Sequence, residues 1–495
     1  MDRLEYYAYL ASTVPAADLA RAAARKVAQR ANLALRKKAP LEHSELLHAF
    51  CAEDARDLAF KMAAPRASML WADSGRRDEV LSVAGQVPGL VGRVLARADR
   101  AWAREFDVFG RKVCFGRGLG TIDWHKDALS GGRFDPAMDA LAIGFGNEGL
   151  DPKAPWAVAR FEQALALGQG VWISPSEEDR ARYAHEFTTQ VIHFARMNPV
   201  WTGVNWSCAM EVALRAANLC LGYLMMRHRP ELQSPEFALT FATMLSAHGR
   251  YIEEHLEHTG AVSNNHYVAN LVGLLHLGVI FPELPGARGW RERAARGLQE
   301  EIRRQVNDDG FSFEGSTAYH RLATELFTLA LFIAHAGRIR LGDDYEQRLH
   351  DMYRAVRGYL TPGMKAPQIG DNDSGRALPL CDRGPLEHGY LLPLGAALFL
   401  DPELKPEGMP YCDEALFLMG PAGLERYRSL AESGPPRSSA LARGGLYFVR
   451  SGETYCAISC GPNGQAGVGG HSHNDKLGIE LHVGEHPVVV DTGTY

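Results

Sequence analysis

Residues 208–226 read CAMEVALRAANLCLGYLMM, and their apolar side chains recur every three or four positions. That spacing places these side chains on one face of an α-helix. Residues 476–483 read KLGIELHV, in which apolar side chains alternate with charged, His or Gly positions. Alternation of this kind is typical of a β-strand with one buried face. The sequence therefore predicts both α-helices and β-strands. The position at which the spacing changes from one to the other indicates a boundary between domains.

The helical spacing extends from about residue 16 to about residue 400, as in residues 44–62, 267–281 and 323–337. Successive helix pairs of roughly 40 to 60 residues suit helical hairpins arranged in an arc or toroid. Between about 105 and 160 the helical spacing is lost, and the sequence is rich in Gly and aromatic residues. For that stretch we expect loops and short strands.

The β-type alternation begins near residue 440, in short runs separated by Gly, Asn and Pro. We therefore expect a multidomain α+β protein with a helical segment over 1–100, a helical domain over 101–410 and a β domain over 440–495. About four strands fit into this last part, which would leave an unpaired sheet edge. We accordingly expect the β domain to be truncated in this sequence.

The composition is that of a large globular protein. Of the 495 residues, 46% are hydrophobic and 23% are charged. The net charge of −6 argues against nucleic acid binding through overall positive charge, so an anionic substrate would need a locally basic groove. No uninterrupted apolar run is long enough to predict a membrane span. The opening residues carry no export signal and the eight cysteines form no CxxC pair, so we expect a cytoplasmic protein with reduced thiols.

Polar side chains that could support chemistry gather in three segments. In the first segment, Asn264, Asn265 and His266 come directly before a strongly apolar helix. Asn is a favoured residue at a helix N-terminus, and one of the two would be enough to cap this helix. The segment therefore predicts either a cap or a functional amide and imidazole group.

The second segment is a turn rich in Gly and Ser that opens into a helix. Tyr319, His320 and Arg321 occupy the first turn of that helix. Tyr is also common at the edge of a core, where its ring is buried and its hydroxyl contacts solvent. Both interpretations stay open for this segment.

The third segment has flexible glycines followed by His471 and His473, with Asp475 two residues further on. Side chains two positions apart project from the same side of an extended strand. Neutral imidazole is the commonest metal ligand and also a natural acid or base near neutral pH. The pair therefore predicts a ligand or catalytic cluster, with ordinary structural histidines as the alternative.

These segments belong to a longer series of motifs in a fixed order. The series is IDWHKD (122–127), NNHY (264–267), FEGSTAYH (313–320), IGDNDSGR (369–376), GGHSHNDKLGIEL (469–481) and VVVDTGTY (488–495). With this series the sequence resembles the heparinase II/III-like polysaccharide lyases over roughly residues 100–495. The resemblance implies an incomplete α/α toroid followed by an antiparallel β-sandwich, with the active cleft between them.

The activity that the resemblance implies is β-elimination at a uronic acid residue of an acidic polysaccharide. The C5 proton lies next to a carboxylate and is very weakly acidic, so the enzyme must neutralise that carboxylate and stabilise the developing charge. By resemblance, Asn265 and His266 lie at the carboxylate. Tyr319 is the acid, and for one uronate epimer also the base, while His471 is the alternative base.

The resemblance also assigns residues that bind substrate and metal. The expected substrate-binding residues are Asn264, His320, Arg321 and Arg376. The two arginines would supply the positive charge that the overall composition lacks. Zinc is the expected metal, bound by His473 and Asp491 with a third ligand beyond residue 495. A hydrogen bond between His473 and Asp491 is the alternative to metal binding.

Two other classes of function stay open at this point. A glycoside hydrolase on the same scaffold would need two carboxylates, for which Asp371 and Asp373 are candidates. We prefer a loop role for both, because alternating Asp, Asn and Gly residues form turns. A carbohydrate-binding protein of surface polysaccharide assembly would keep the fold without the reaction. The sequence does not identify the polymer, whether a glycosaminoglycan, alginate or bacterial exopolysaccharide, nor the oligomeric state, and relatives of this kind are often periplasmic or secreted.

Overall fold

The computed structural model describes residues 42–64, 70–116, 118, 121–144, 149–474 and 476–493. The helices are α3 (His43–Ala49), α4 (Ala55–Ala63), α5 (Arg77–Ala84), α6 (Leu90–Trp102), α7 (Lys153–Ala159), α8 (Glu162–Ile173), α9 (Glu177–Met197), α10 (Ala209–Met226), α11 (Pro235–Glu254), α12 (Asn265–Ile280), α13 (Ala287–Gln305), α14 (Thr317–Ala336), α15 (Asp343–Tyr359), α16 (Leu391–Phe399) and α17 (Asp413–Ser429). The strands are β1 (Glu105–Val108), β2 (Arg111–Cys114), β3 (Ser439–Leu441), β4 (Leu446–Ser451), β5 (Thr454–Ser459), β6 (Gly478–Val483) and β7 (His486–Val489).

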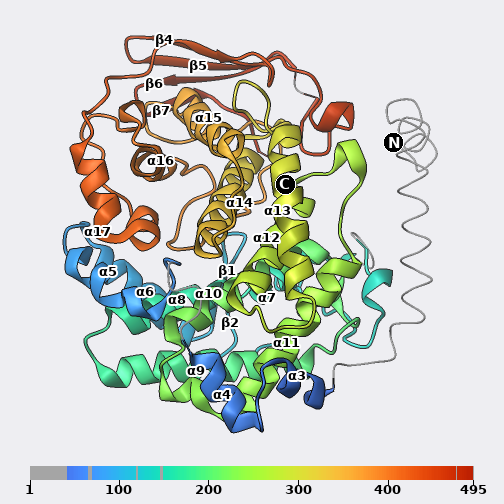
Figure 1. Ribbon diagram of the computed structural model, residues 1–495. Helices are drawn as coiled ribbons and strands as arrows, with labels where there is room; N and C mark the ends of the chain where they lie inside the picture. Colours follow the sequence, from blue (N-terminus) through green and yellow to red (C-terminus); the bar gives the residue numbers. More distant parts are fainter. Residues whose placement is uncertain are drawn as a thin grey trace.

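The helices from α6 onward form two layers of an arc (Figure 1). Alternate helices α6, α8, α10, α12 and α14 contact one another in turn. Helices α9, α11, α13 and α15 each pack against one or two members of that inner series. Successive helix pairs thus form helical hairpins side by side, and the predicted incomplete α/α toroid is confirmed.

The inner helices are apolar on all sides because they have neighbours on all sides. Every residue of α10 is buried, and α12 and α14 are almost as fully enclosed. Among the described helices, α10 also has the length and apolar composition that a membrane crossing requires. Because α10 is completely buried inside the protein, its apolar composition is explained by its place in the inner layer of the toroid.

The C-terminal strands lie at one end of the helical arc, above α15 in Figure 1. Strands β3 to β7 form one antiparallel sheet in sequence order, which confirms the predicted antiparallel β domain. The predicted short strands between residues 105 and 160 are also present, since β1 and β2 pair as an antiparallel hairpin.

Strand β4 shows why this sheet packs with one face on the helices. Leu446 and Phe448 are buried, whereas Tyr447 and Val449 between and after them are exposed. The alternation follows from the two-residue period of a strand, which sends successive side chains to opposite faces. The buried face therefore continues the core that the helices begin.

Three hydrogen bonds from the sheet end on the last turn of α15 and the residues after it. The Tyr455 hydroxyl donates to the Tyr359 carbonyl at 2.6 Å. The Arg450 guanidinium donates to the carbonyls of Gly358 and Leu360 at 2.8 and 2.7 Å. These bonds satisfy carbonyls at the helix C-terminus that have no partner within the helix, and they fix the sheet to the toroid.

The turn between β3 and β4 lies in close contact with the segment that follows β5. Asp309 Oδ2 accepts hydrogen bonds from the backbone N–H groups of Arg443 and Gly444 at 2.6 and 3.1 Å. Gly445 follows with φ +70°, and a Cβ there would lie 1.8 Å from the Gly461 Cα. Glycine is required at residue 445 for both its backbone conformation and this close approach.

We predict that Gly445→Ala destabilises the protein by more than the cost of its backbone conformation. A non-glycine residue in this conformation costs about 1–2 kcal/mol, and the overlap with Gly461 adds about 1–3 kcal/mol. Gly452→Ala is the matched control, because Gly452 also has positive φ but a Cβ there has nothing within 4 Å. Urea unfolding should show a clearly larger loss for Gly445→Ala, and equal losses would contradict the close approach described here.

Candidate active site

The segments singled out by the sequence meet where the toroid faces the sheet. Two of them begin helices, each with a side-chain cap. The Asn264 side chain accepts from the His266 backbone N–H at 3.1 Å, and the Ser316 hydroxyl accepts from the Tyr319 backbone N–H at 3.2 Å. Caps of this kind fix the direction in which the first helical residues point. Asn264 is therefore a capping residue, and its role in substrate binding stays a prediction.

Asn265 is fully buried beside the carboxylate of Glu314. Its backbone N–H and its Nδ2 donate to the two Glu314 oxygens at 2.9 and 2.8 Å. Glu314, also fully buried, accepts a longer hydrogen bond of 3.4 Å from Gln465 Nε2. The Oδ1 atom of Asn265 has no partner within the described part of the chain. The amide is thus held in one orientation, with an unused acceptor in the site.

Tyr319 and His471 lie face to face although they are 152 positions apart in the sequence. Their ring centroids are 3.5 Å apart and the planes differ by 14°. The Tyr319 hydroxyl donates to Asp373 Oδ2 at 2.8 Å, and Lys153 Nζ lies 3.3 Å from the same oxygen. A tyrosine, a histidine, a carboxylate and a cation therefore share one small volume.

Burial and the neighbouring Asp373 raise the pKa of Tyr319 well above its usual value, so its hydroxyl keeps its proton at neutral pH. For Asp373 itself, burial favours the protonated form, but the charge of Lys153 and the hydrogen bond from Tyr319 outweigh it and lower the pKa. The pair is therefore a neutral phenol that donates to a carboxylate.

Asp371 binds both histidines of the third segment. Its Oδ2 lies 3.2 Å from His471 Nδ1, and its Oδ1 lies 2.9 Å from His473 Nε2. Burial opposes ionisation of Asp371, but the two imidazoles outweigh it and lower the pKa of the carboxyl. Residues 471–473 lie in a loop before β6, so the predicted shared strand face is wrong. The two rings are brought together by a shared carboxylate instead.

The two predicted zinc ligands, His473 and Asp491, have protein partners in this structure. His473 Nε2 faces Asp371, while Asp491 Oδ1 accepts from the Gly493 backbone N–H at 2.7 Å. Among the described residues, neither belongs to a group of three mutually close metal donors. The third ligand was expected beyond residue 495, so the zinc site stays a prediction, and the alternative of a direct bond between His473 and Asp491 is not what these contacts show.

His266 points away from Glu314 toward a different carboxylate. Its Nδ1 lies 2.8 Å from Glu257 Oε1 and 3.9 Å from the Cys208 sulfur. Burial disfavours the charged imidazole, but Glu257 outweighs this effect and raises the pKa of His266 well above 6.5. His266 is therefore close to Asn265 in sequence but belongs to a separate cluster of side chains.

His320 and Arg321 are fully buried and bind backbone groups of the toroid, which corrects the prediction that they contact substrate. His320 Nδ1 accepts from the Ser312 backbone N–H at 3.1 Å, and Nε2 lies 3.0 Å from the Met352 carbonyl. These partners require the neutral ring with its proton on Nε2. Arg321 Nη1 donates to the Gly384 carbonyl at 3.3 Å. Both side chains connect parts of the toroid.

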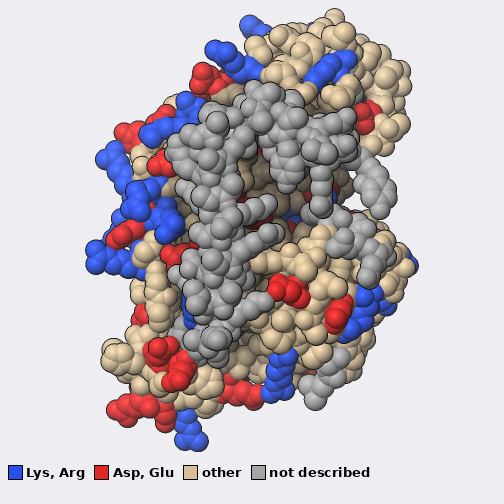
Figure 2. Space-filling model, turned by 90° about the vertical axis from the view of Figure 1, so that its right-hand side faces the viewer, with Lys and Arg blue, Asp and Glu red and all other residues tan. Residues whose placement is uncertain are grey.

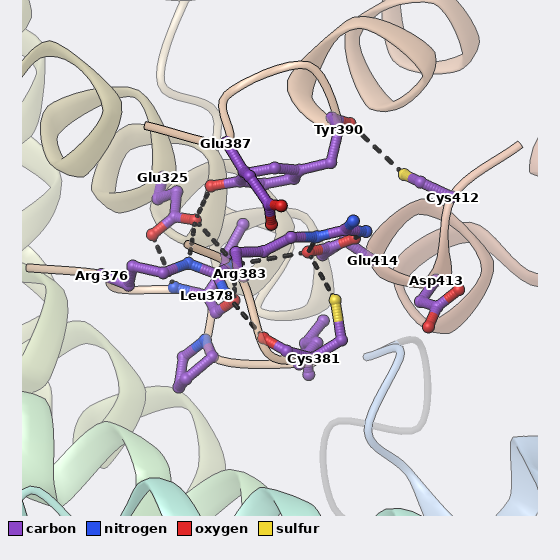
Figure 3. A network of polar contacts seen from close by, with 12 residues as sticks. Glu325, Arg376, Leu378, Cys381, Arg383, Glu387, Tyr390, Cys412, Asp413 and Glu414 are labelled. Atoms are coloured by element: carbon purple, nitrogen blue, oxygen red, sulfur yellow. Dashed lines mark hydrogen bonds and ion pairs between the residues drawn. The ribbon is translucent and has the colours of Figure 1, made fainter. Parts of the chain in front are cut away.

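Arg376 is almost fully buried in a polar network of the toroid (Figure 3). It lies 3.2 Å from Glu325 and 3.3 Å from Glu414, and Arg383 also pairs with Glu414 at 2.8 Å. Two carboxylates and several carbonyls neutralise and satisfy this guanidinium, as buried charges require. The predicted contact of Arg376 with substrate is therefore wrong for this structure, since its charge is used inside the fold.

Glu314 and Lys153 were not predicted as functional residues, and Asp371 and Asp373 were candidates only for the hydrolase alternative. The sequence suggested a turn role for the two aspartates, and Asp373 Oδ1 accepts a weak hydrogen bond of this kind from the Gly375 N–H. Alternating polar residues in a Gly-rich loop were the available signal for them. For Lys153 and Glu314, no sequence pattern indicated proximity to Tyr319 or Asn265.

Comparison of the sequence with known proteins shows the family to which this chain belongs. Residues 96–379 match the heparinase II/III N-terminus, and residues 433–495 match the heparinase II/III-like C-terminal region. The chain belongs to the heparinase II/III family. These two matched regions correspond to the toroid and to the antiparallel sheet, so the family has both parts of the fold described above.

Two curated relatives of this heparinase II/III family member are named heparin-sulfate lyase. The one from Pedobacter heparinus is 28% identical over 233 residues, which are 45% of this chain and 33% of the relative. The one from Bacteroides stercoris is 26% identical over 205 residues, 37% of this chain and 29% of the relative. The matches therefore span about a third of the curated relatives.

The fold also resembles a solved structure of the same family. A crystal structure of heparinase III superposes with a TM-score of 0.56 at 17% identity, over 81% of this chain and 58% of that chain. At this identity the likeness concerns the fold. It supports the toroid and antiparallel β structure that the sequence predicted.

Removing the Arg376 side chain should destabilise the fold without weakening substrate binding. We predict that Arg376→Gln lowers the free energy of unfolding by about 3–5 kcal/mol, because Glu325 and Glu414 stay buried with less compensation. Arg340→Gln is the control, since its ion pair with Asp343 is about 80% exposed or more and such pairs contribute about 0–1 kcal/mol. A stable Arg376→Gln protein with a raised KM would refute the structural role.

Burial lowers the pKa of His320 from 6.5 to about 4. Between these pH values the unfolded chain binds a proton that the folded chain does not, so the free energy of unfolding falls as pH falls. We predict a loss of about 3 kcal/mol from this residue between neutral pH and pH 4. His320→Gln should show a smaller decrease in denaturant titrations over that range, and an unchanged pH dependence would contradict the neutral buried ring.

Proposed function

We propose that this protein is a polysaccharide lyase that cleaves a uronate-containing polysaccharide by β-elimination, and thus a carbon–oxygen lyase. The observation that carries the proposal is the stacked pair of Tyr319 and His471, with the buried amide of Asn265 held by Glu314 close to His471. An acid, a base and a polar group for a carboxylate are the three functions that this reaction needs.

The reaction removes a proton from C5 of the uronate and expels the substituent at C4. The C5–H bond breaks, a C4–C5 double bond forms and the C4–O4 bond breaks, so that O4 leaves with a proton. We assign that proton to Tyr319, because its raised pKa keeps the hydroxyl protonated until the leaving oxygen needs it. The same raised pKa makes Tyr319 a poor base.

His471 is the base in this proposal. Asp371 at 3.2 Å from Nδ1 favours a proton on that nitrogen, so Nε2 is the nitrogen left to exchange a proton with substrate. Nε2 lies 3.4 Å from Glu314, next to the amide of Asn265. The base and the group proposed to bind the uronate carboxylate are therefore neighbours, as removal of a proton next to a carboxylate requires.

Asn265 is proposed to neutralise the uronate carboxylate. Its Nδ2 has two hydrogens and gives one to Glu314, which leaves the second for a substrate oxygen. Glu314 holds the amide plane in place, and a donor fixed before the reaction stabilises developing charge without reorganisation. Lys153 adds a positive charge near the departing oxygen through its contact with Asp373.

The hydrolase alternative has less support from these contacts. It requires one carboxyl that donates a proton and one carboxylate that activates water or attacks the sugar. Asp371 is engaged by two histidines, and Asp373 is engaged by Tyr319 and Lys153. In both carboxyl groups the neighbouring groups lower the pKa, which opposes a role as proton donor.

The proposed substrate class is a glycosaminoglycan of the heparan type, since the two curated relatives are named heparin-sulfate lyase. Acidic and basic side chains are mixed on the face of the protein shown in Figure 2. Recognition of the polyanion is therefore proposed to depend on local cations such as Lys153 rather than on a broad basic surface.

Tyr319→Phe should abolish turnover while leaving the fold intact, because only the acidic hydroxyl is removed. The measurement is the ultraviolet absorbance of the unsaturated uronate product from a panel of defined glycosaminoglycans and alginate. Tyr345→Phe is a matched control, since this buried tyrosine donates to the Phe327 carbonyl in the toroid. A Tyr319→Phe protein that retains a tenth or more of the wild-type rate would refute the assignment.

The same assay separates the three classes of function in the wild-type protein. A lyase produces the unsaturated chromophore and a new reducing end together. A hydrolase produces reducing ends without the chromophore, and a binding protein produces neither. Either of the last two outcomes on every polymer tested would overturn the proposed function.

A further inference from the structure

A second cluster of donor atoms lies where α10 and α12 begin. Cys208 directly precedes α10, His266 lies in the first turn of α12, and Glu257 lies in the segment between α11 and α12. Their sulfur, imidazole nitrogen and carboxylate oxygen are all within 4.8 Å of one another. The proposed elimination reaction uses neither Cys208 nor Glu257.

The three donor atoms form a triangle of the size that a tetrahedral zinc ion needs. Cys208 Sγ is 3.7 Å from Glu257 Oε1 and 3.9 Å from His266 Nδ1, and the last two atoms are 2.8 Å apart. Ordinary zinc–sulfur, zinc–nitrogen and zinc–oxygen bonds at tetrahedral angles give separations of about 3.5, 3.5 and 3.3 Å. Each observed edge is within about half an ångström of these values.

Neighbouring groups hold Glu257 so that one oxygen is left for the cluster. Glu257 Oε2 accepts from the Met210 backbone N–H at 2.8 Å and from Asn270 Nδ2 at 3.2 Å. Its Oε1 is the atom that faces both Cys208 and His266. Partners outside the ligand set that orient a ligand in this way are typical of metal sites.

The sulfur of Cys208 is also available. Cys208 occupies the N-cap position of α10, yet its side chain makes no capping hydrogen bond, and its sulfur is in no disulfide. Burial and the neighbouring Glu257 raise the pKa of the Cys208 thiol to about 11, so zinc binding would release its proton. A thiolate is the form in which cysteine binds zinc.

We propose that Cys208, Glu257 and His266 form a zinc site with one open coordination position. Three protein ligands of mixed sulfur, nitrogen and oxygen character suit zinc better than calcium or magnesium, which prefer oxygen alone. The side chains of His266 and Glu257 are 34% and 29% exposed, so the ion has access from solvent. The fourth ligand would be water or another oxygen donor. This site is distinct from the zinc site predicted at His473 and Asp491.

The test uses the full chain, stripped of metal with a chelator and titrated with Co²⁺ as a spectroscopic substitute for Zn²⁺. We expect one equivalent of Co²⁺ to give a thiolate-to-cobalt charge-transfer band that Zn²⁺ removes by competition. Cys208→Ser should abolish the band. Cys220→Ser, which changes a buried cysteine within α10, should retain it, and so should His473→Ala.

Glu257→Gln provides a second variant if Cys208→Ser does not fold, and it should weaken Co²⁺ binding at least tenfold. A wild-type protein without the band, a band that survives Cys208→Ser, or unchanged affinity in Glu257→Gln would overturn the proposal. The readout is independent of catalysis, so a protein inactive on every polymer that still binds Co²⁺ through Cys208 would refute the proposed function and support this site.

Discussion

The site depends on one buried carboxylate, that of Glu314. It accepts hydrogen bonds from the backbone and side chain of Asn265 and from Gln465, and it lies 3.4 Å from His471. These residues come from the start of α12 and from the connection between β5 and β6. A buried carboxylate is costly unless such donors surround it. The need to satisfy Glu314 therefore ties the toroid to the loop that carries His471.

Asp371 makes a second connection between the toroid and the loop that carries His471. Its backbone N–H donates to the His471 carbonyl at 2.9 Å, while its side chain faces His471 and His473. Gly370 precedes it with φ +71°, and a Cβ there would lie 2.6 Å from the His471 carbonyl oxygen. Backbone and side-chain contacts together place the His471 ring on Tyr319. The geometry of the proposed acid and base is thus set by contacts between the two parts of the fold.

The fold itself was largely predictable, because it is governed by local periodicity. The apolar sequence of α10 requires burial on every side, and a helix of that kind belongs to an inner layer. The alternation in β4 and β6 predicted strands, and the polar residues before α12 and α14 marked where these helices begin. The loop position of His471 and His473 was not predictable in the same way, because alternation alone does not distinguish a strand from an extended loop.

By itself the sequence determined the helix and strand periods, a cap of α12 by one of Asn264 and Asn265, and the residue types that an elimination needs. Only the tertiary structure decided which polar side chains share a site. Arg321 and Arg376 have the right charge for a polyanion, yet they are buried among partners up to 63 positions away. Asp373 meets Tyr319 from 54 positions away, and Lys153 meets Asp373 from 220 positions away. Burial and charge pairing depend on such distant contacts, which no local pattern records.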